Sequence, residues 1–166
     1  MKLTRLFLVF ASFTAIVVAS DTAVLAASKT SSFNVTSSVA ANCSISTVDI
    51  TFGPYDPISG SDLNVNGSVT VACTKGATTP SIALGMGNNS ATTTPDNAMK
   101  NGGNTDLLKY SLYQDSGYAT RWNGASMSIP ASGKTGVPYT IYGKVLAGQD
   151  VSVGSYSDVV VATINY

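Results

Sequence analysis

The sequence predicts an all-β protein, an antiparallel sandwich of two sheets, and three observations lead to this fold class. Apolar side chains recur at every second residue over short segments, which is the period of a strand with one buried face. Turn-forming Gly, Pro and Asn residues separate these segments, and no helical period follows the hydrophobic N-terminal stretch. The chain also contains no Glu and is rich in Ser, Thr, Val and Tyr, a composition that favours strands and turns.

About six strands are predicted from the first cysteine onward, within residues 43–53, 63–73, 80–87, 107–115, 137–147 and 154–166. The alternation is interrupted between Ile45 and Val48, which predicts a β-bulge in the first strand. The polar run 87–106 has no periodicity and predicts a long loop. The pair Asn123-Gly124 predicts a turn.

The predicted sandwich lacks a strand at its C-terminal end and has one to spare before it begins. An immunoglobulin-like sandwich has roughly seven or more strands, whereas the last strand predicted here ends at Tyr166. Before the first cysteine, Phe33, Val35 and Val39 fall on odd positions, which is the pattern of a strand with one apolar face. Ser37 lies between them on the same face and interrupts the apolar row.

The N-terminal residues predict export. Lys2 and Arg5 precede an apolar run over residues 6–19, and small residues then indicate cleavage after Ala26 or Ala27. The alternative is a transmembrane anchor, but polar residues interrupt the run well short of the roughly 20 residues that a membrane span needs. Residues 1–27 are therefore predicted to be a signal peptide.

The two cysteines and the net charge limit which metals and macromolecules the chain is expected to bind. Cys43 and Cys73 are the only cysteines, and in an oxidising compartment they predict one disulfide. A zinc site is the alternative, which the absence of His and Glu disfavours. Residues 28–166 carry a formal net charge of −1, so neither nucleic acid nor an anionic membrane is expected as a partner.

The residues available for chemistry argue against an enzyme and a cofactor. Without His, a Ser–His–Asp or Cys–His site has no base. The run Asp62 to Gly67 resembles the first half of a calcium loop, but Cys73 stands where the loop needs Glu. A hydrolase using only Asp56 or Asp62 is a remote alternative, since turn aspartates are common. Trp122 is expected in the core rather than on a sugar-binding surface.

Several segments in order carry a family resemblance. They are "FNVTSSVAANCSIS", "ITFGPYDP", "NGSVTVACTKG", "LLKYSLYQD", "IYGKV" and the terminal "GSYSDVVVATINY". Together they resemble the spore coat protein U domain, a family that includes pilins of the archaic chaperone–usher pathway. The resemblance covers residues 33–166. It implies an incomplete immunoglobulin-like β-sandwich lacking its last strand, with residues 28–42 as an N-terminal donor strand and residues 43–166 as the pilin domain.

The resemblance also implies a structural subunit of a surface pilus or fimbria, with a role in adhesion or biofilm formation. In this family a periplasmic chaperone fills the groove of the missing strand. At the outer-membrane usher, the N-terminal extension of the next subunit replaces the chaperone. The donor positions that match are Phe33, Val35, Ser37 and Val39, and the family's disulfide maps to Cys43 and Cys73. Partners are then neighbouring subunits, the chaperone and the usher.

For the last strand, the residues expected to face the groove and the core are Val160, Ala162, Ile164 and Tyr166. The opposite register, with Val159 and Val161 inward, stays open because the strand is apolar on both faces. Ser37 indicates a shallow pocket or a weaker donor, and Ser37→Val is expected to tighten the pairing if its pocket has room.

A second hypothesis comes from another class of protein. The chain is then a secreted coat or matrix protein whose loops, such as residues 85–106, bind a glycan or a surface. In that case the N-terminal strand folds back on its own domain and the protein is a monomer.

Overall fold

The computed structural model describes residues 26–90, 96–131 and 133–166, and all regular structure in them is β-strand. The predicted signal peptide lies outside these residues except for Ala26 and Ala27. The strands are β1 (Cys43–Val48), β2 (Leu63–Cys73), β3 (Ser81–Leu84), β4 (Asn97–Asn101), β5 (Leu107–Tyr113), β6 (Ser126–Ser128), β7 (Val137–Val145), β8 (Tyr156–Ser157) and β9 (Ala162–Asn165).

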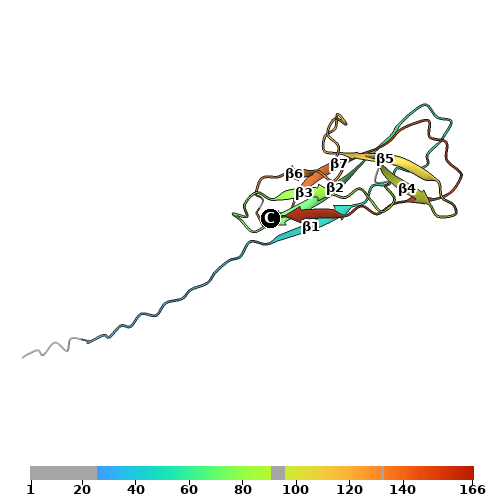
Figure 1. Cartoon of the computed structure of the whole chain (residues 1–166). Helices are drawn as coiled ribbons and strands as arrows, with labels where there is room; N and C mark the ends of the chain where they lie inside the picture. Colours follow the sequence, from blue (N-terminus) through green and yellow to red (C-terminus); the bar gives the residue numbers. More distant parts are fainter. Residues whose placement is uncertain (1–25, 91–95, 132) are drawn as a thin grey trace, which may run out of the picture. The chain divides into compact units, whose positions relative to one another are not determined.

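The strands form two antiparallel sheets, which confirms the predicted fold class (Figure 1). The larger sheet has the order β1-β2-β7-β5-β4-β8, and the smaller has the order β6-β3-β9. The C-terminal segment contributes to both sheets. Its residues Tyr156 and Ser157 pair with β4, and its residues Ala162–Asn165 pair with β3. It thus crosses from one sheet to the other, as strands at the corners of sandwiches do.

Contacts divide the chain into two units, Met1–Ser37 and Ser38–Tyr166, and the sandwich belongs to the second. In the described part of the first unit, residues 26–37, the backbone forms no strand and the side chains are exposed. No helix long and apolar enough to cross a membrane occurs within residues 26–90, 96–131 and 133–166.

The structure corrects two of the expected elements. Part of the predicted long loop 87–106 is a strand, β4, which pairs with β5 and β8. Its buried residues include Asn97 and Asn101, so the strand lacks the apolar alternation that identifies strands in a sequence. The predicted bulge is also wrong, because the ladder between β1 and β2 is continuous from Cys43 to Val48. The inward face changes parity only after β1, where Ile50 and Phe52 are half-buried.

The core lies between the two sheets, and Trp122 is part of it, as predicted. Its side chain is 1% exposed, and its indole Nε1 donates to the carbonyl of Tyr113 at 3.1 Å. Its backbone N–H donates to Leu112 at 2.9 Å. The turn at Asn123-Gly124, where both residues have positive φ, leads from Trp122 toward β6.

The predicted disulfide is confirmed, since Cys43 and Cys73 are bonded at an S–S distance of 2.04 Å. The two residues stand opposite each other at one end of the β1–β2 ladder. On the chain-entropy model, closing a loop of this length contributes about 3–4 kcal/mol to stability. The bond ties the first strand to the sandwich at the point where the N-terminal extension ends.

Candidate functional site: an open groove between two edge strands

The most prominent feature of the sandwich is that its two edges lie beside each other without pairing. β1 ends the larger sheet and β9 ends the smaller one. Figure 1 draws β1 in cyan and β9 in red side by side, and contacts between the two confirm the proximity. Within the described residues no ladder joins them. The sandwich is therefore open along this line.

A cavity of about 930 Å³ lies between the two edges. One wall is formed by residues 47–55 and Pro57, and the other by residues 151–158 with Val160 and Ala162. The floor consists of side chains from both sheets, namely Leu84, Met99, Leu108, Tyr110, Leu112 and Ile141. Its volume lies within the range of pockets that hold ligands, about 300–1,000 Å³. An open groove of this size can therefore accommodate a ligand or a segment of chain.

Two glycines let the first wall approach the floor closely. An added Cβ on Gly67 would lie 2.5 Å from Cγ1 of Ile50, and one on Gly143 would lie 2.9 Å from Cζ of Phe52. Ile50 and Phe52 thus pack directly over bare backbone of β2 and β7. This close approach fixes the wall in place although residues 49–55 pair with no strand.

The second wall offers its backbone to the cavity. In an antiparallel strand, successive residues direct their N–H and C=O groups to opposite sides. The carbonyl of Val161 accepts from Gly85 at 2.9 Å and that of Ser155 accepts from Gly102 at 3.1 Å, so the odd residues bond to the neighbouring strands. The even residues Val160 and Ala162 consequently direct their backbone groups to the open edge, and their side chains line the cavity.

One polar pair interrupts the apolar lining. The Tyr110 hydroxyl donates to Oδ2 of Asp158 at 2.7 Å, and both residues line the cavity. Oδ1 of Asp158 accepts from the backbone of Asn88 at 2.9 Å and from the side chain of Asn89 at 3.0 Å. Burial, followed by the contact with Asp158, raises the pKa of Tyr110 above its usual range. Tyr110 therefore stays protonated at neutral pH and acts as a donor to the carboxylate.

A second carboxylate holds the start of the same wall. Oδ2 of Asp106 accepts from the backbone N–H of Ser152 at 2.9 Å and from its hydroxyl. These bonds, the hydroxyl first, lower the pKa of Asp106. The contact fixes residues 151–155 against the loop between β4 and β5.

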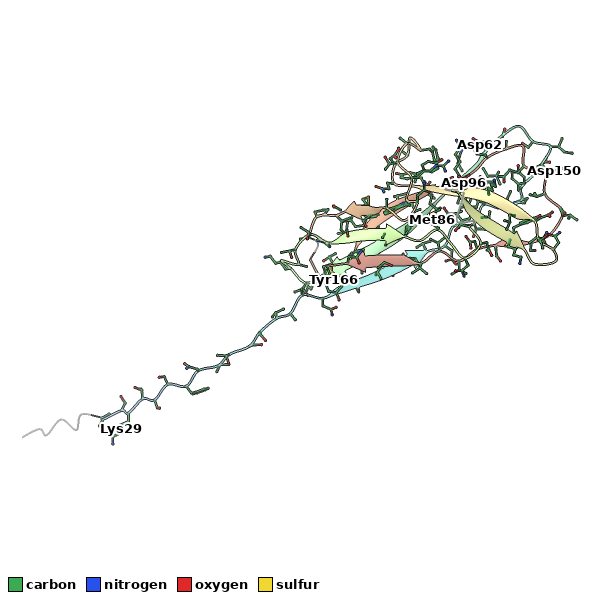
Figure 2. The ribbon with its side chains drawn as sticks, in the orientation of Figure 1. Lys29, Asp62, Met86, Asp96, Asp150 and Tyr166 are labelled. Atoms are coloured by element: carbon green, nitrogen blue, oxygen red, sulfur yellow. A yellow bond between two sulfur atoms is a disulfide. The ribbon has the colours of Figure 1, made fainter. Side chains whose placement is uncertain are left out.

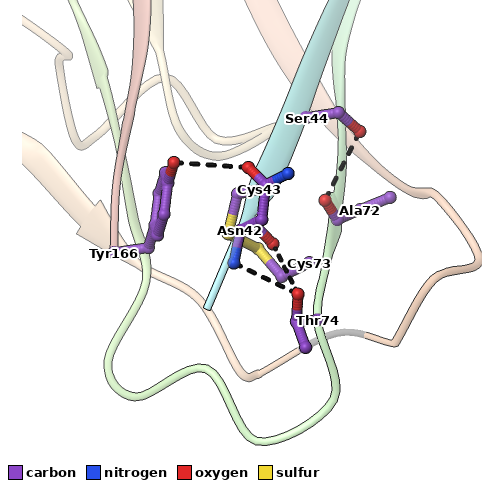
Figure 3. The surroundings of a disulfide bond; sticks show 7 residues. All are labelled: Asn42, Cys43, Ser44, Ala72, Cys73, Thr74 and Tyr166. Atoms are coloured by element: carbon purple, nitrogen blue, oxygen red, sulfur yellow. Dashed lines mark hydrogen bonds between the residues drawn. A yellow bond between two sulfur atoms is a disulfide. The ribbon is translucent and has the colours of Figure 1, made fainter. Parts of the chain in front are cut away.

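Near the disulfide, Tyr166 lies beside the start of β1 (Figure 3). The Tyr166 hydroxyl lies 3.4 Å from Oδ1 of Asn42, whose backbone N–H donates to Oγ1 of Thr74 at 3.1 Å. Tyr166 is 55% exposed and does not line the cavity, which differs from the expectation that it faces the groove and the core.

The other residues expected to face the groove lie either in the cavity or against the core. Val160 and Ala162 line the cavity, and Ile164 packs against the core beyond it. Val159 and Val161 are 61% and 63% exposed on the outer face. That these residues accept a donated strand stays a prediction.

The residues expected to form the donor strand are exposed. Phe33, Val35 and Val39 are exposed to 85%, 84% and 83%, and Ser37 is also exposed. A row of large apolar side chains in solvent is uncommon unless the row serves an interaction.

The candidate calcium residues are placed differently from a metal loop. Asp62 pairs with Nζ of Lys144 at 3.0 Å and accepts from the backbone of Ala147 at 2.9 Å. Asn64 and Asn66 lie on the outer face within β2. Figure 2 shows Asp62 at the opposite end of the sandwich from Tyr166, far from the disulfide.

Comparison with known proteins assigns this architecture to a family. The model of the Spore Coat Protein U domain matches residues 29–163. The chain belongs to the spore coat protein U domain family. Protein U of Myxococcus xanthus is 38% identical, over 82% of this chain and 84% of the relative.

The fold is also similar to that of a solved structure. The match is a chain in the crystal structure of the CsuC–CsuE chaperone–tip adhesion subunit pre-assembly complex from archaic chaperone–usher Csu pili of Acinetobacter baumannii. The TM-score is 0.57 and the sequence identity is 22%, over 77% of this chain. The match spans 40% of the length of the solved chain. At this identity the match shows a shared fold.

For this spore coat protein U domain, sequence reasoning missed the polar pair in the groove. Tyr110 and Asp158 fall within the predicted strands 107–115 and 154–166, but neither position reveals a contact between residues 48 apart. A usable signal is the acid itself, because Asp158 falls on the same parity as Val160 and Ala162 in an otherwise apolar row.

Proposed function

We propose that this protein is a structural subunit of a surface pilus, polymerised through donor-strand exchange. Residues 33–39 of one copy enter the groove of the next copy and pair with the open edge of the C-terminal segment that leads into β9. The observation that carries the proposal is the open apolar cavity of about 930 Å³ in a chain whose N-terminal extension exposes a row of apolar side chains.

Strand addition satisfies two physical requirements at once. The backbone groups of Val160 and Ala162 gain ladder bonds, and alternate side chains of the donor fill the cavity. Burying the side chains of Phe33, Val35 and Val39 contributes roughly 1.5–3 kcal/mol each before the cost of ordering the extension. The contact is head to tail, so it propagates into a fibre when it does not close into a ring. Insertion also requires the contact between Tyr166 and Asn42 to open.

The same groove explains the need for other partners. Before assembly, an exposed groove is an aggregation hazard, because it combines apolar surface with an unpaired strand edge. A periplasmic chaperone that fills the groove removes the hazard, and an outer-membrane usher then exchanges the chaperone for the next subunit. In this proposal residues 1–27 direct export and are removed, residues 28–42 form the donor segment, and residues 43–166 form the pilin domain. The fibre reaches the cell surface, where it serves adhesion or biofilm formation.

Deletion of residues 28–41 is expected to abolish fibres. The truncated subunit keeps its groove and disulfide but has no strand to donate, so chain growth stops. The measurement is the ladder of unheated, detergent-treated surface material on a gel, with the chaperone and usher co-expressed. A control that replaces residues 28–41 by Gly and Ser residues of equal length is expected to fail equally. Fibres that assemble normally from either variant would sink the proposal.

The alternative function predicts a different species in solution. A coat or matrix protein that fills its own groove with its own extension is a monomer. Size-exclusion chromatography of the purified mature protein distinguishes the two functions, since a polymer that resists detergent supports fibres and a lone monomer supports the coat protein.

A further inference from the structure

We infer that the donor strand binds antiparallel to the C-terminal segment in a fixed register, with Ser37 of one subunit opposite Asp158 of the next. This inference rests on the proposed function and specifies the residues that align the two subunits. The pair formed by Asp158 and Tyr110 is the contact that selects the register.

The inner face of the wall has a definite order of side chains. Along residues 156–162 the half-buried positions are the even ones, Tyr156, Asp158, Val160 and Ala162, and all four line the cavity; Ser157 also borders the cavity, but its side chain is exposed. One of the four is charged, and one is as small as a methyl group. The donor has the same two irregularities on its apolar face, because Ser37 is polar and Phe33 is the largest side chain.

Only one antiparallel alignment matches both irregularities. With Ser37 opposite Asp158, Val35 faces Val160 and Phe33 faces Ala162, while Val39 faces Tyr156. The largest donor side chain then meets the smallest wall residue. The hydroxyl meets the carboxylate of Asp158, which is hydrogen-bonded to Tyr110 at 2.7 Å. The pair of Val35 and Val160 lies between these two pairs.

The antiparallel direction follows from the sandwich. All seven ladders in the described residues are antiparallel. Parallel pairing is slightly less stable per residue. A strand added along residues 156–162 therefore continues the antiparallel pattern of the sandwich.

A shift by two residues is unfavourable in either direction. It places Val35 or Val39 over Asp158, so that methyl groups remove water from the carboxylate. The carboxylate keeps its bonds from Tyr110, Asn88 and Asn89 but gains no donor for the acceptor position that the Ser37 hydroxyl would fill, and burying an unfilled charged acceptor is costly. The same shift moves the Ser37 hydroxyl onto Val160 or Tyr156, where no carboxylate accepts from it. Ser37 is thus a register residue and not a weak point of the donor.

This assignment reverses one expectation from the sequence. If Ser37 only interrupted an apolar row, Ser37→Val would strengthen the pairing. With Asp158 opposite, Ser37→Val is expected to lower the temperature at which fibres dissociate into monomers on a gel. A rise in that temperature would overturn the inference.

Cross-linking tests the register without altering the residues that set it. In the proposed alignment Thr36 lies opposite Val159 on the outer face, where Val159 is 61% exposed. Opposed residues at such positions lie about 4.5–5.5 Å apart at Cα, which a disulfide spans. We expect Thr36→Cys/Val159→Cys fibres, treated with a mild oxidant, to give a ladder that survives boiling without reductant.

Two matched controls report the shifted registers. Thr36→Cys/Val161→Cys and Thr36→Cys/Ser157→Cys place the second cysteine two residues away on the same outer face, and neither is expected to cross-link. A boiling-resistant ladder from either control, with none from the first pair, overturns the register but leaves donor-strand exchange intact. If the fibres resist detergent but none of the three cysteine pairs forms a cross-link, the proposed alignment is also wrong. Monomers in every variant and in the unmodified protein overturn the proposed function itself.

Discussion

Val35→Asp is expected to abolish the detergent-resistant ladder of fibres. Val35 is the central apolar residue of the donor strand, and its proposed position is over the floor formed by Leu108 and Leu112. A carboxylate there loses its hydration without gaining a partner, a cost of several kcal/mol or more. The measurement is again the gel ladder of unheated surface material.

Thr36→Asp is the matched control, because Thr36 is the next residue and lies on the opposite face of the same strand. It introduces the same charge into the same segment but leaves it in solvent, so the ladder is expected to persist. Equal loss in both variants would show that charge anywhere in the extension blocks assembly, and would contradict the assignment of an inward face.

Trp122→Ala is expected to destabilise the folded domain by about 3–5 kcal/mol. The side chain is 1% exposed, and its removal leaves a cavity and deprives the Tyr113 carbonyl of its indole donor. The measurement is the midpoint of thermal unfolding of the mature protein by circular dichroism.

Tyr166→Ala serves as the aromatic control for the same experiment. Because Tyr166 is 55% exposed, its removal is expected to change the midpoint far less than the removal of Trp122. An unchanged midpoint for Trp122→Ala would indicate that this side chain serves binding rather than the core.

The strands that the sequence predicts correctly are those with one apolar face. In β2, the odd residues Val65, Val69 and Val71 face inward, and in β3 Ile82 and Leu84 do. The period of two residues follows directly from the pleat of a strand, so the assignment needs no tertiary information. The disulfide is predicted for a similar reason, since two cysteines in an exported chain have one pairing.

The elements that the sequence does not predict depend on contacts between distant residues. β4 is a strand because it pairs with β5 and β8, with Asn97, Ala98 and Asn101 buried, and nothing in the sequence Asn-Ala-Met-Lys-Asn reveals this. The parity change after β1 depends on Gly67 and Gly143, which leave room for Ile50 and Phe52. Tertiary packing overrides local pattern at both places.

The candidate site likewise has some features that the sequence reveals and others that depend on the fold. The apolar rows of the extension and of the last strand are visible in the sequence, and so is the parity of Asp158. The shape of the groove is not, because its walls come from residues 47–57 and 151–162 and its floor comes from four other strands. The hydrogen bond between Tyr110 and Asp158 is likewise a product of the fold.

A structure of the assembled fibre by electron cryomicroscopy tests the central claim most directly. Donor-strand exchange predicts continuous density for residues 33–39 of one subunit between β1 and β9 of the next, with Val35 over the cavity floor. Density that connects each groove to the N-terminal extension of its own subunit would contradict the claim, and so would a groove left empty in the fibre.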